Sequence, residues 1–330
     1  MSELRVGVMF RCSTEPEVLY PFARRVGELG YDELWVVEDC FYAGGIASAA
    51  AALAATERVA VGLGILPAVM RNPAAVAMDL AALSRLFPGR VLPGFGHGVA
   101  AWMRQIGALP RSQLAALGET ISAVRALLAG QTVTTHGAHV HLDAVRLDHP
   151  PRTRPPVLAG VRGPRSLALS GRVADGTILA ELSSPAYVRW ARERINAGRA
   201  EAHRADPHRL VVYALLGVGA RGRQAVREEM ADVLLQGGSA QLGPSEGADA
   251  KALATLAATT SDAATLAAEL PAALVDQLAV TGEPAECARS LQRIHQAGAD
   301  TVVLVPPHDP AAATEQLEHA AGQVLPALKQ

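Results

Sequence analysis

Two carboxylates and a thiol follow a short apolar segment early in the chain. Leu34–Val37 is typical of a buried β-strand, and Glu38, Asp39 and Cys40 come directly after it, before a Gly-Gly pair leads into an alanine-rich helix. Charged side chains are costly inside an apolar sheet. In a parallel barrel, however, the carboxyl ends of the strands carry the active site. We therefore take Glu38, Asp39 and Cys40 as candidate catalytic groups, provided that the rest of the chain builds such a barrel.

Glycine, histidine and arginine follow other predicted strands. The segment 160–165 (Gly-Val-Arg-Gly-Pro-Arg) combines glycines, the start of a helix and two arginines, which together favour binding of a phosphate. The alternative is a glycine turn with two solvated arginines. His97 lies between two glycines, where a catalytic or cofactor role and a simple hydrogen bond to the backbone both fit. Glu181 either contacts the tail of a cofactor or is a polar loop residue.

Alternating apolar strands and helices must position these groups. The pattern predicts an α/β fold, a (β/α)8 barrel in a single domain over residues 1–330, with a doubly wound open sheet as the alternative. A hairpin at about 132–142 and an alanine-rich insertion at about 237–282 interrupt this alternation. Within the insertion we expect helices at Ala248–Thr259 and Ala263–Val280. The predicted strands are Arg5–Phe10, Leu34–Val37, Arg58–Pro67, Arg90–Pro93, Pro156–Ala159, Gly176–Ala180, Arg209–Val218 and Thr301–Val305. The predicted helices are Glu15–Leu29, Ile46–Ala55, Ala74–Leu86, Ser112–Leu128, Pro164–Ser170, Pro185–His203, Glu283–Ala297 and Pro310–Leu328.

Composition excludes several classes of function. With 30 basic and 32 acidic residues spread over 330 positions, the chain has no basic block for nucleic acid. It has no long apolar run and no leader, so we expect a cytoplasmic protein that does not bind a membrane. The three cysteines lack metal-binding spacing and fit free thiols. His136, His139 and His141 alternate along the hairpin without a further ligand, so we expect no metal.

An ordered set of motifs carries a resemblance over nearly the whole chain. The segments are Val6-Gly7-Val8, Trp35–Asp39, Val61–Ile65, Arg71–Ala74, Leu83-Ser84, Pro88–Gly98, Gly163–Leu167 and Ala174–Gly176. In this order they resemble the luciferase-like flavin and deazaflavin oxidoreductases. The resemblance is closest to the branch of the methylenetetrahydromethanopterin reductases, which use the deazaflavin coenzyme F420.

This resemblance implies a barrel with an insertion after strand seven and a cofactor ring at the end of strand three. A non-proline cis peptide is implied at Gly64-Ile65, with Gly96 and His97 beside the ring. The cofactor phosphate is expected on Gly160, Val161, Arg162, Gly163 and Pro164, with Glu181 near the cofactor tail. Phe10, Phe41 and Trp102 are the candidates for the substrate pocket, although an aromatic ring such as that of Trp102 at a helix start also suits packing. Family members are commonly homodimers, and the alanine-rich helices after strands two and three suit such a contact.

Cys40 departs from the family pattern. In the alcohol and sugar-phosphate dehydrogenases of this family the corresponding triplet resembles Ser-Asp-His, whose histidine takes the hydroxyl proton. A thiol, with an ordinary pKa of about 8.5, is a poor general base beside two carboxylates. The sequence therefore favours hydride transfer to a C=C or C=N bond of a small molecule, with Glu38 or Asp39 as the acid. The alternative is that Asp39 only binds the ring or caps a helix. An FMN-dependent monooxygenase and a non-catalytic ligand-binding barrel are the alternative functions.

Overall fold

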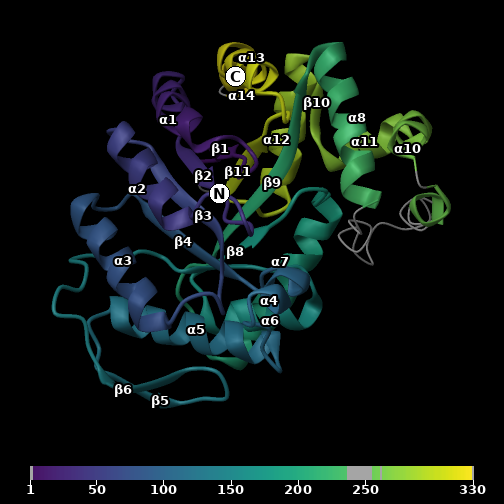
Figure 1. Ribbon diagram of the computed structural model, residues 1–330. Helices are drawn as coiled ribbons and strands as arrows, with labels where there is room; N and C mark the ends of the chain where they lie inside the picture. Colours follow the sequence, from purple (N-terminus) through teal and green to yellow (C-terminus); the bar gives the residue numbers. More distant parts are fainter. Residues whose placement is uncertain (1–2, 236–254, 261, 329–330) are drawn as a thin grey trace. The chain divides into compact units, whose positions relative to one another are not determined.

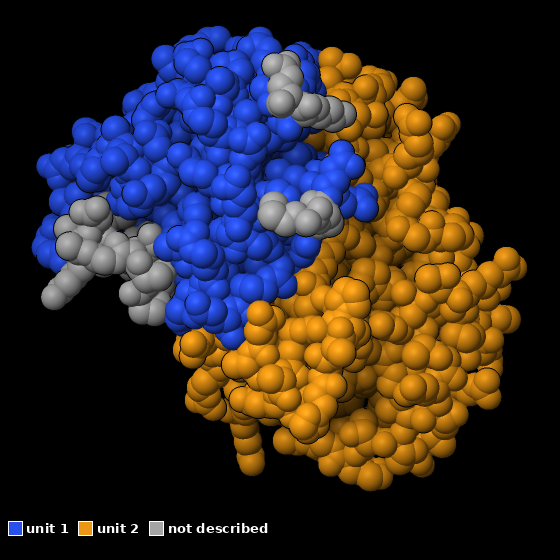
Figure 2. All heavy atoms as spheres, turned by 180° about the vertical axis from the view of Figure 1, so that it is seen from behind, with its two compact units in different colours: residues 1–9, 179–193, 210–330 blue, residues 10–178, 194–209 orange. Residues whose placement is uncertain are grey.

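A computed structural model describes residues 3–235, 255–260 and 262–328 (Figure 1). The chain forms two compact units (Figure 2). The first comprises residues 1–9, 179–193 and 210–330, and the second comprises residues 10–178 and 194–209. The predicted single domain stays a prediction.

The second unit is built on five parallel strands in the order β2-β3-β4-β7-β8. Helices pack along this sheet in pairs, α1 on α2, α3 on α5, and α5 on α6 (Figure 1). The strands are β2 (Glu33–Val36), β3 (Ala60–Pro67), β4 (Val91–Gly96), β7 (Leu158–Gly160) and β8 (Gly176–Leu179), the last residue of which belongs to the first unit. The helices are η1 (Pro16–Val18), α1 (Leu19–Glu28), α2 (Gly45–Ala55), α3 (Pro73–Leu86), α4 (Ala100–Gln105), α5 (Gln113–Leu128) and α6 (Pro164–Val173).

The predicted hairpin is present in this unit. β5 (Val133–His136) pairs antiparallel with β6 (His141–Val145). The carboxylate of Glu119 in α5 accepts the backbone N–H groups of Ala138, His139 and Val140 at 3.1, 2.8 and 2.9 Å. The hairpin is thus tied to the helix beneath it and adds nothing to the main sheet.

The first unit contains four parallel strands in the order β10-β9-β11-β1. Its strands are β1 (Arg5–Phe10), β9 (Arg209–Val218), β10 (Val280–Gly282) and β11 (Thr301–Val305). Phe10 at the end of β1 and Arg209 at the start of β9 belong to the second unit. Its helices are α8 (Gly219–Leu235), α10 (Ala263–Glu269), α11 (Ala272–Leu278), α12 (Pro284–Gln296), α13 (Pro310–His319), the π-helical turn η3 (Ala320–Val324) and α14 (Leu325–Leu328). Helix α7 (Pro185–Glu201) begins in this unit and ends in the other.

The predicted insertion differs from expectation where the structure describes it. The single helix predicted over Ala263–Val280 is wrong, because Pro271 separates α10 from α11 and the chain from Val280 forms β10 on β9. Helix α8 was not predicted. The segment 236–254, which contains most of the predicted helix Ala248–Thr259, lies outside the described residues.

Local sequence explains where several helices begin. Asn72, Ser112 and Asp309 precede α3, α5 and α13, and each side chain accepts a backbone N–H of the first turn at 2.8, 3.2 and 2.8 Å. Such caps satisfy donors that have no partner within the helix. Pro73 and Pro310 follow two of these caps, at positions that need no N–H.

Trp35 explains the glycine on the neighbouring strand of the second unit. Its fully buried ring lies beside Gly62, its register partner on β3, where an added Cβ would lie 2.2 Å from the ring. Its indole N–H donates to buried Glu33 at 3.0 Å, and Arg209 pairs with the same carboxylate. These contacts fix β2, whose carboxyl end leads to Glu38 and Asp39.

Candidate active site

Glu38 is buried and fully engaged by hydrogen-bond donors. The guanidinium of Arg71 donates to its two carboxylate oxygens at 2.5 and 2.7 Å, and the backbone N–H of Gly45 donates at 2.6 Å. A bidentate pair of this kind has fixed geometry and balances the buried charge. Glu38 therefore ties the segment after β2 to the start of α2 and to Arg71, which follows β3. We call these three residues the Glu38 clamp.

Asp39 is half-buried and keeps more freedom to change its protonation state. The thiol of Cys12 lies 3.4 Å from its Oδ2, and the backbone N–H of Tyr42 donates to its carbonyl oxygen at 2.9 Å. Burial raises the pKa of Asp39, the contact with Cys12 lowers it, and the nearby charge of Glu38 raises it, with a net rise. A carboxyl group of this kind can hold a proton closer to neutrality than an exposed aspartate.

Both thiols near this segment are neutral at physiological pH. Burial and the adjacent Asp39 raise the pKa of Cys12 to about 12. Burial and the charges of Glu38 and Asp39 also raise the pKa of Cys40, whose Sγ lies 3.7 Å from the Met70 sulfur. Because the thiolate is the nucleophilic form, these surroundings favour neither a nucleophile nor a base.

The end of β3 has an irregular backbone. The Gly64-Ile65 peptide is cis, as the resemblance implies, and a second non-proline cis peptide joins Cys40 and Phe41. The register of β3 on β4 shifts between Leu63 and Leu66, so β3 contains a bulge there.

The side chain of Ile65 fills the space that neighbouring glycines leave open. A Cβ on Gly160 would lie 2.4 Å from Ile65 Cγ2, and a Cβ on Gly96 would lie 2.8 Å from Ile65 Cδ1. The ends of β3, β4 and β7 therefore meet around one aliphatic side chain. Gly160 and Gly96, predicted as cofactor contacts, are required as glycines by Ile65 whether or not a ligand is bound.

His97 is held at both ring nitrogens. Its Nδ1 lies 3.2 Å from the Gln113 carbonyl oxygen, and its Nε2 lies 3.1 Å from Ser166 Oγ. Because a carbonyl only accepts, Nδ1 carries the proton and Nε2 accepts from the serine hydroxyl. Burial lowers the pKa of His97, and the contact with Gln113 opposes this. A neutral ring thus connects the end of β4 to the starts of α5 and α6. Ser166 was not predicted as its partner, because the two residues are 69 positions apart.

The predicted phosphate segment forms the start of α6. Val161 is buried and its N–H donates to the Ile178 carbonyl at 3.2 Å, so it belongs to the sheet. Gly163 is the N-cap and Pro164 the first helical residue, while Arg162 and Arg165 are exposed. The first turn contains no acidic residue. Helix amides beside two arginines, in a first turn without acidic residues, favour an anion here.

The predicted substrate residues have different surroundings. Phe10 is buried and packs edge-on against Phe22, with ring centroids 5.2 Å apart. Trp102 is partly buried, and Phe41 is 61% exposed. Glu181 follows β8 in the first unit and is partly buried.

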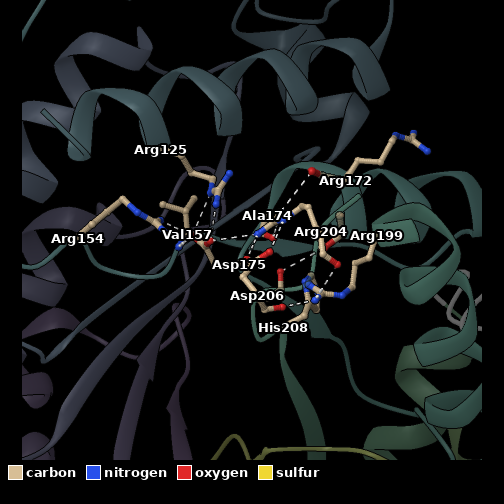
Figure 3. A network of polar contacts seen from close by, with 12 residues as sticks. Arg125, Arg154, Val157, Arg172, Ala174, Asp175, Arg199, Arg204, Asp206 and His208 are labelled. Atoms are coloured by element: carbon tan, nitrogen blue, oxygen red, sulfur yellow. Dashed lines mark hydrogen bonds and ion pairs between the residues drawn. The ribbon is translucent and has the colours of Figure 1, made fainter. Parts of the chain in front are cut away.

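A second polar cluster, centred on Asp175, was not predicted as a cluster (Figure 3). The buried carboxylate accepts from Arg125 at 2.6 and 3.1 Å, from Arg154 at 2.5 and 3.1 Å, and from Arg204 at 3.4 Å. The backbone N–H of Val157 adds a bond of 2.9 Å. Asp175 directly precedes β8 and so lies at the amino end of a barrel strand, whereas active sites of such barrels lie at the carboxyl ends.

Two classes of site are not found in the described part of the chain. Residues 3–235, 255–260 and 262–328 contain no group of three His, Cys, Asp or Glu side chains that could hold a metal ion. None of the helices described is long and apolar enough to cross a membrane.

Known proteins resemble this chain in sequence over most of its length. A 5,10-methylenetetrahydromethanopterin reductase of Methanolobus tindarius is 25% identical over 298 residues, which cover 88% of this chain and 90% of the relative. An F420-dependent glucose-6-phosphate dehydrogenase of Beutenbergia cavernae is 32% identical over 191 residues, covering 53% of this chain and 56% of the relative.

Solved structures show the fold, and a family model shows the family. An F420-dependent tetrahydromethanopterin reductase of Methanopyrus kandleri superposes with a TM-score of 0.81 at 19% identity, covering 99% of this chain and 100% of that one. This likeness confirms the predicted (β/α)8 barrel over the open sheet. The model that describes luciferase-like monooxygenases matches residues 13–301. The chain therefore belongs to the luciferase-like monooxygenase family.

Proposed function

We propose that this oxidoreductase uses coenzyme F420 and transfers hydride between the reduced deazaflavin and a C=C or C=N bond of a small organic substrate. Both sequence relatives described above are reductases or dehydrogenases, and the second is named as F420-dependent. FMN is the alternative cofactor, because an FMN complex of a Baeyer-Villiger monooxygenase shares the fold with a TM-score of 0.71.

The residues present fit a phosphate-bearing cofactor of this kind. The start of α6, with Gly160, Val161, Arg162, Gly163 and Pro164, would hold the phosphate, because helix amides and two exposed arginines lie there and the first turn contains no acidic residue. The irregular end of β3 at Gly64 and Ile65, with Gly96 and His97, would support the ring, and Glu181 is proposed for the tail. When bound, the coenzyme supplies the hydride.

Among the protein's own residues, Asp39 is the proposed proton donor. Reduction of a C=C bond requires a proton as well as a hydride. The raised pKa of Asp39 and its half-buried position suit a carboxyl group that delivers this proton from Oδ. Glu38 is the weaker candidate, because Arg71 and Gly45 occupy its oxygens. Cys40 and His97 are proposed to shape the site, since one is a neutral thiol and the other is bonded at both nitrogens.

A turnover assay with reduced F420 under nitrogen tests this function. Unsaturated ketones and cyclic imines are screened, and reoxidation of the coenzyme is followed by its visible absorbance. We expect Asp39→Asn to lower kcat for C=C reduction about 100-fold or more, the range of general acid catalysis. Asp143→Asn, at an exposed position on β6, is the matched control. Equal turnover by Asp39→Asn and the wild type would show that another group donates the proton. If no substrate is turned over, a non-catalytic ligand-binding barrel is favoured.

We also infer a cytoplasmic homodimer. Cys12, Cys40 and Cys287 are free thiols, which fit a reducing compartment. Met78 and Leu86 on α3 are 62% and 70% exposed, and the alanine-rich α2 adds small side chains that permit close approach of a second subunit. Light scattering coupled to size-exclusion chromatography measures the mass directly.

A further inference from the structure

Large apolar side chains are exposed next to the proposed proton donor. Eight are exposed among the described residues, and five of them lie in the two segments that follow β2 and β4. Their exposed fractions are 61% for Phe41, 57% for Tyr42, 45% for Val99, 41% for Ile106 and 38% for Leu109. We call these five residues the apolar rim.

The sheet brings the two segments of the rim to one edge. β2 and β4 both pair with β3, one on each side, and all three strands are parallel. Their carboxyl ends therefore lie at the same edge, about 10 Å apart at the usual strand spacing. Asp39 leaves β2 at this edge, and the backbone N–H of Tyr42 donates to its carbonyl oxygen at 2.9 Å. The rim thus begins within two residues of the carboxyl group.

Both segments of the rim are anchored, so its exposure belongs to the folded state. The Glu38 clamp holds the segment that carries Phe41 and Tyr42 between β2 and α2. Val99 and Ile106 flank α4, and the fully buried Met103 of that helix fixes it to the core.

We propose that the apolar rim binds the hydrocarbon part of the substrate. Exposed apolar surface marks a contact with a protein, a membrane or a ligand, and the position of the rim beside Asp39 favours the ligand. The substrate class is then an unsaturated ketone or imine with a long alkyl chain or fused rings, rather than a sugar phosphate or a small polar compound. This inference rests on the proposed function, because it assigns the substrate of the same site.

Chain length provides the test. Calorimetric titrations with saturated 2-alkanones of increasing length, with and without oxidised F420, measure binding without turnover, so they remain informative if no reaction is found. We expect Kd to fall about threefold to fourfold for each added methylene while the rim is being covered, the value of a buried CH₂. The double variant Phe41→Ser with Ile106→Ser is expected to flatten this slope. Tyr20→Ser is the matched control, because Tyr20 is 51% exposed on α1, outside the rim.

Two results would overturn the proposal. The first is a Kd that does not change with chain length, or that changes equally in the double variant and the wild type. The second is a double variant that turns a dimer into a monomer on size-exclusion chromatography, since the rim would then be a subunit contact. If the alkanones follow the expected slope while reduced F420 supports no turnover, the rim is retained and the proposed reaction alone fails.

Discussion

Cys12 and Asp39 come from the ends of different strands and meet through a thiol and a carboxylate oxygen 3.4 Å apart. This contact lowers the pKa of Asp39, against the larger effect of burial. Asp39 was placed after a predicted strand, and Cys12 lies two residues beyond the predicted strand Arg5–Phe10. Their contact could not be predicted, because it joins positions 27 apart and depends on how two neighbouring segments end.

Removal of the Cys12 thiol is expected to change the pH dependence of catalysis. Cys12→Ala removes a contact that lowers the pKa of Asp39, so that pKa should rise further. Because the protonated carboxyl is the proposed active form, the alkaline fall in kcat should move to higher pH than in the wild type. The measurement is the pH profile of kcat from pH 5 to 9.

Two further variants serve as controls for Cys12→Ala. Cys12→Ser keeps a donor and should stay closer to the wild type. Cys287→Ala removes a buried thiol of α12 that contacts the Gly282 carbonyl, and its profile should match that of the wild type. A Cys12→Ala profile that is unchanged or moves to lower pH would show that the proton donor is not Asp39.

At the level of elements, the glycines that end β4 and β7 were expected to contact the cofactor, and this explanation of them is incomplete. The sequence suggested close approach of a phosphate or ring. The structure shows that Gly96 and Gly160 already leave room for Ile65 of the bulged β3. The cis peptide at Gly64-Ile65 was predicted only through the family resemblance, because residue types alone do not specify it.

Gly160 and Gly163 provide a matched pair for this element. Gly160→Ala is expected to lower the free energy of unfolding by about 1 to 3 kcal/mol, the usual cost of overpacking, because its Cβ would lie 2.4 Å from Ile65. Gly163 has no atom within 4 Å of an added Cβ and its φ is −73°. Gly163→Ala should therefore leave the free energy of unfolding within about 0.5 kcal/mol of the wild type. Urea denaturation followed by circular dichroism compares the three proteins, and equal loss in both variants would contradict the role of Ile65.

For the molecule as a whole, alternation of strands and helices predicted the barrel, since apolar runs and glycine or proline boundaries are local signals. The described part of the region after β9 was predicted poorly, because alanine-rich segments suit any helix length and only Pro271 marks the boundary between α10 and α11. The Asp175 cluster was missed for a different reason. Arg125, Arg154 and Arg204 are far apart in sequence, and their convergence on one carboxylate depends on the tertiary fold (Figure 3).

Asp175→Asn tests the contribution of this cluster to stability. Burial opposes the charge, but hydrogen bonds from Arg154 and Arg125 hold the pKa of Asp175 well below its usual range. We expect a loss of about 3 to 5 kcal/mol at pH 7, the usual cost of removing one partner of a buried pair. Because the pKa of Asp175 is lower in the folded state than in the unfolded state, its charge stabilises the fold at pH values above the unfolded pKa, near 3.9. This stabilisation is lost as the pH falls below that value. The variant should therefore show a flatter loss of stability below about pH 4.

Urea denaturation between pH 3 and pH 7 provides this comparison, with Asp143→Asn as the control for an exposed aspartate. A loss below about 0.5 kcal/mol for Asp175→Asn would show that the arginines are solvated well enough without their partner.

The central claim concerns the cofactor, and a titration of the purified protein with oxidised F420 and with FMN tests it most directly. Intrinsic fluorescence reports binding, and dialysis before the titration removes carried-over ligand. We expect F420 to bind in the low micromolar range and FMN to be lost on dialysis. Tight binding of FMN together with no binding of F420 would contradict the account and assign the chain to the oxygen-dependent monooxygenases of its family.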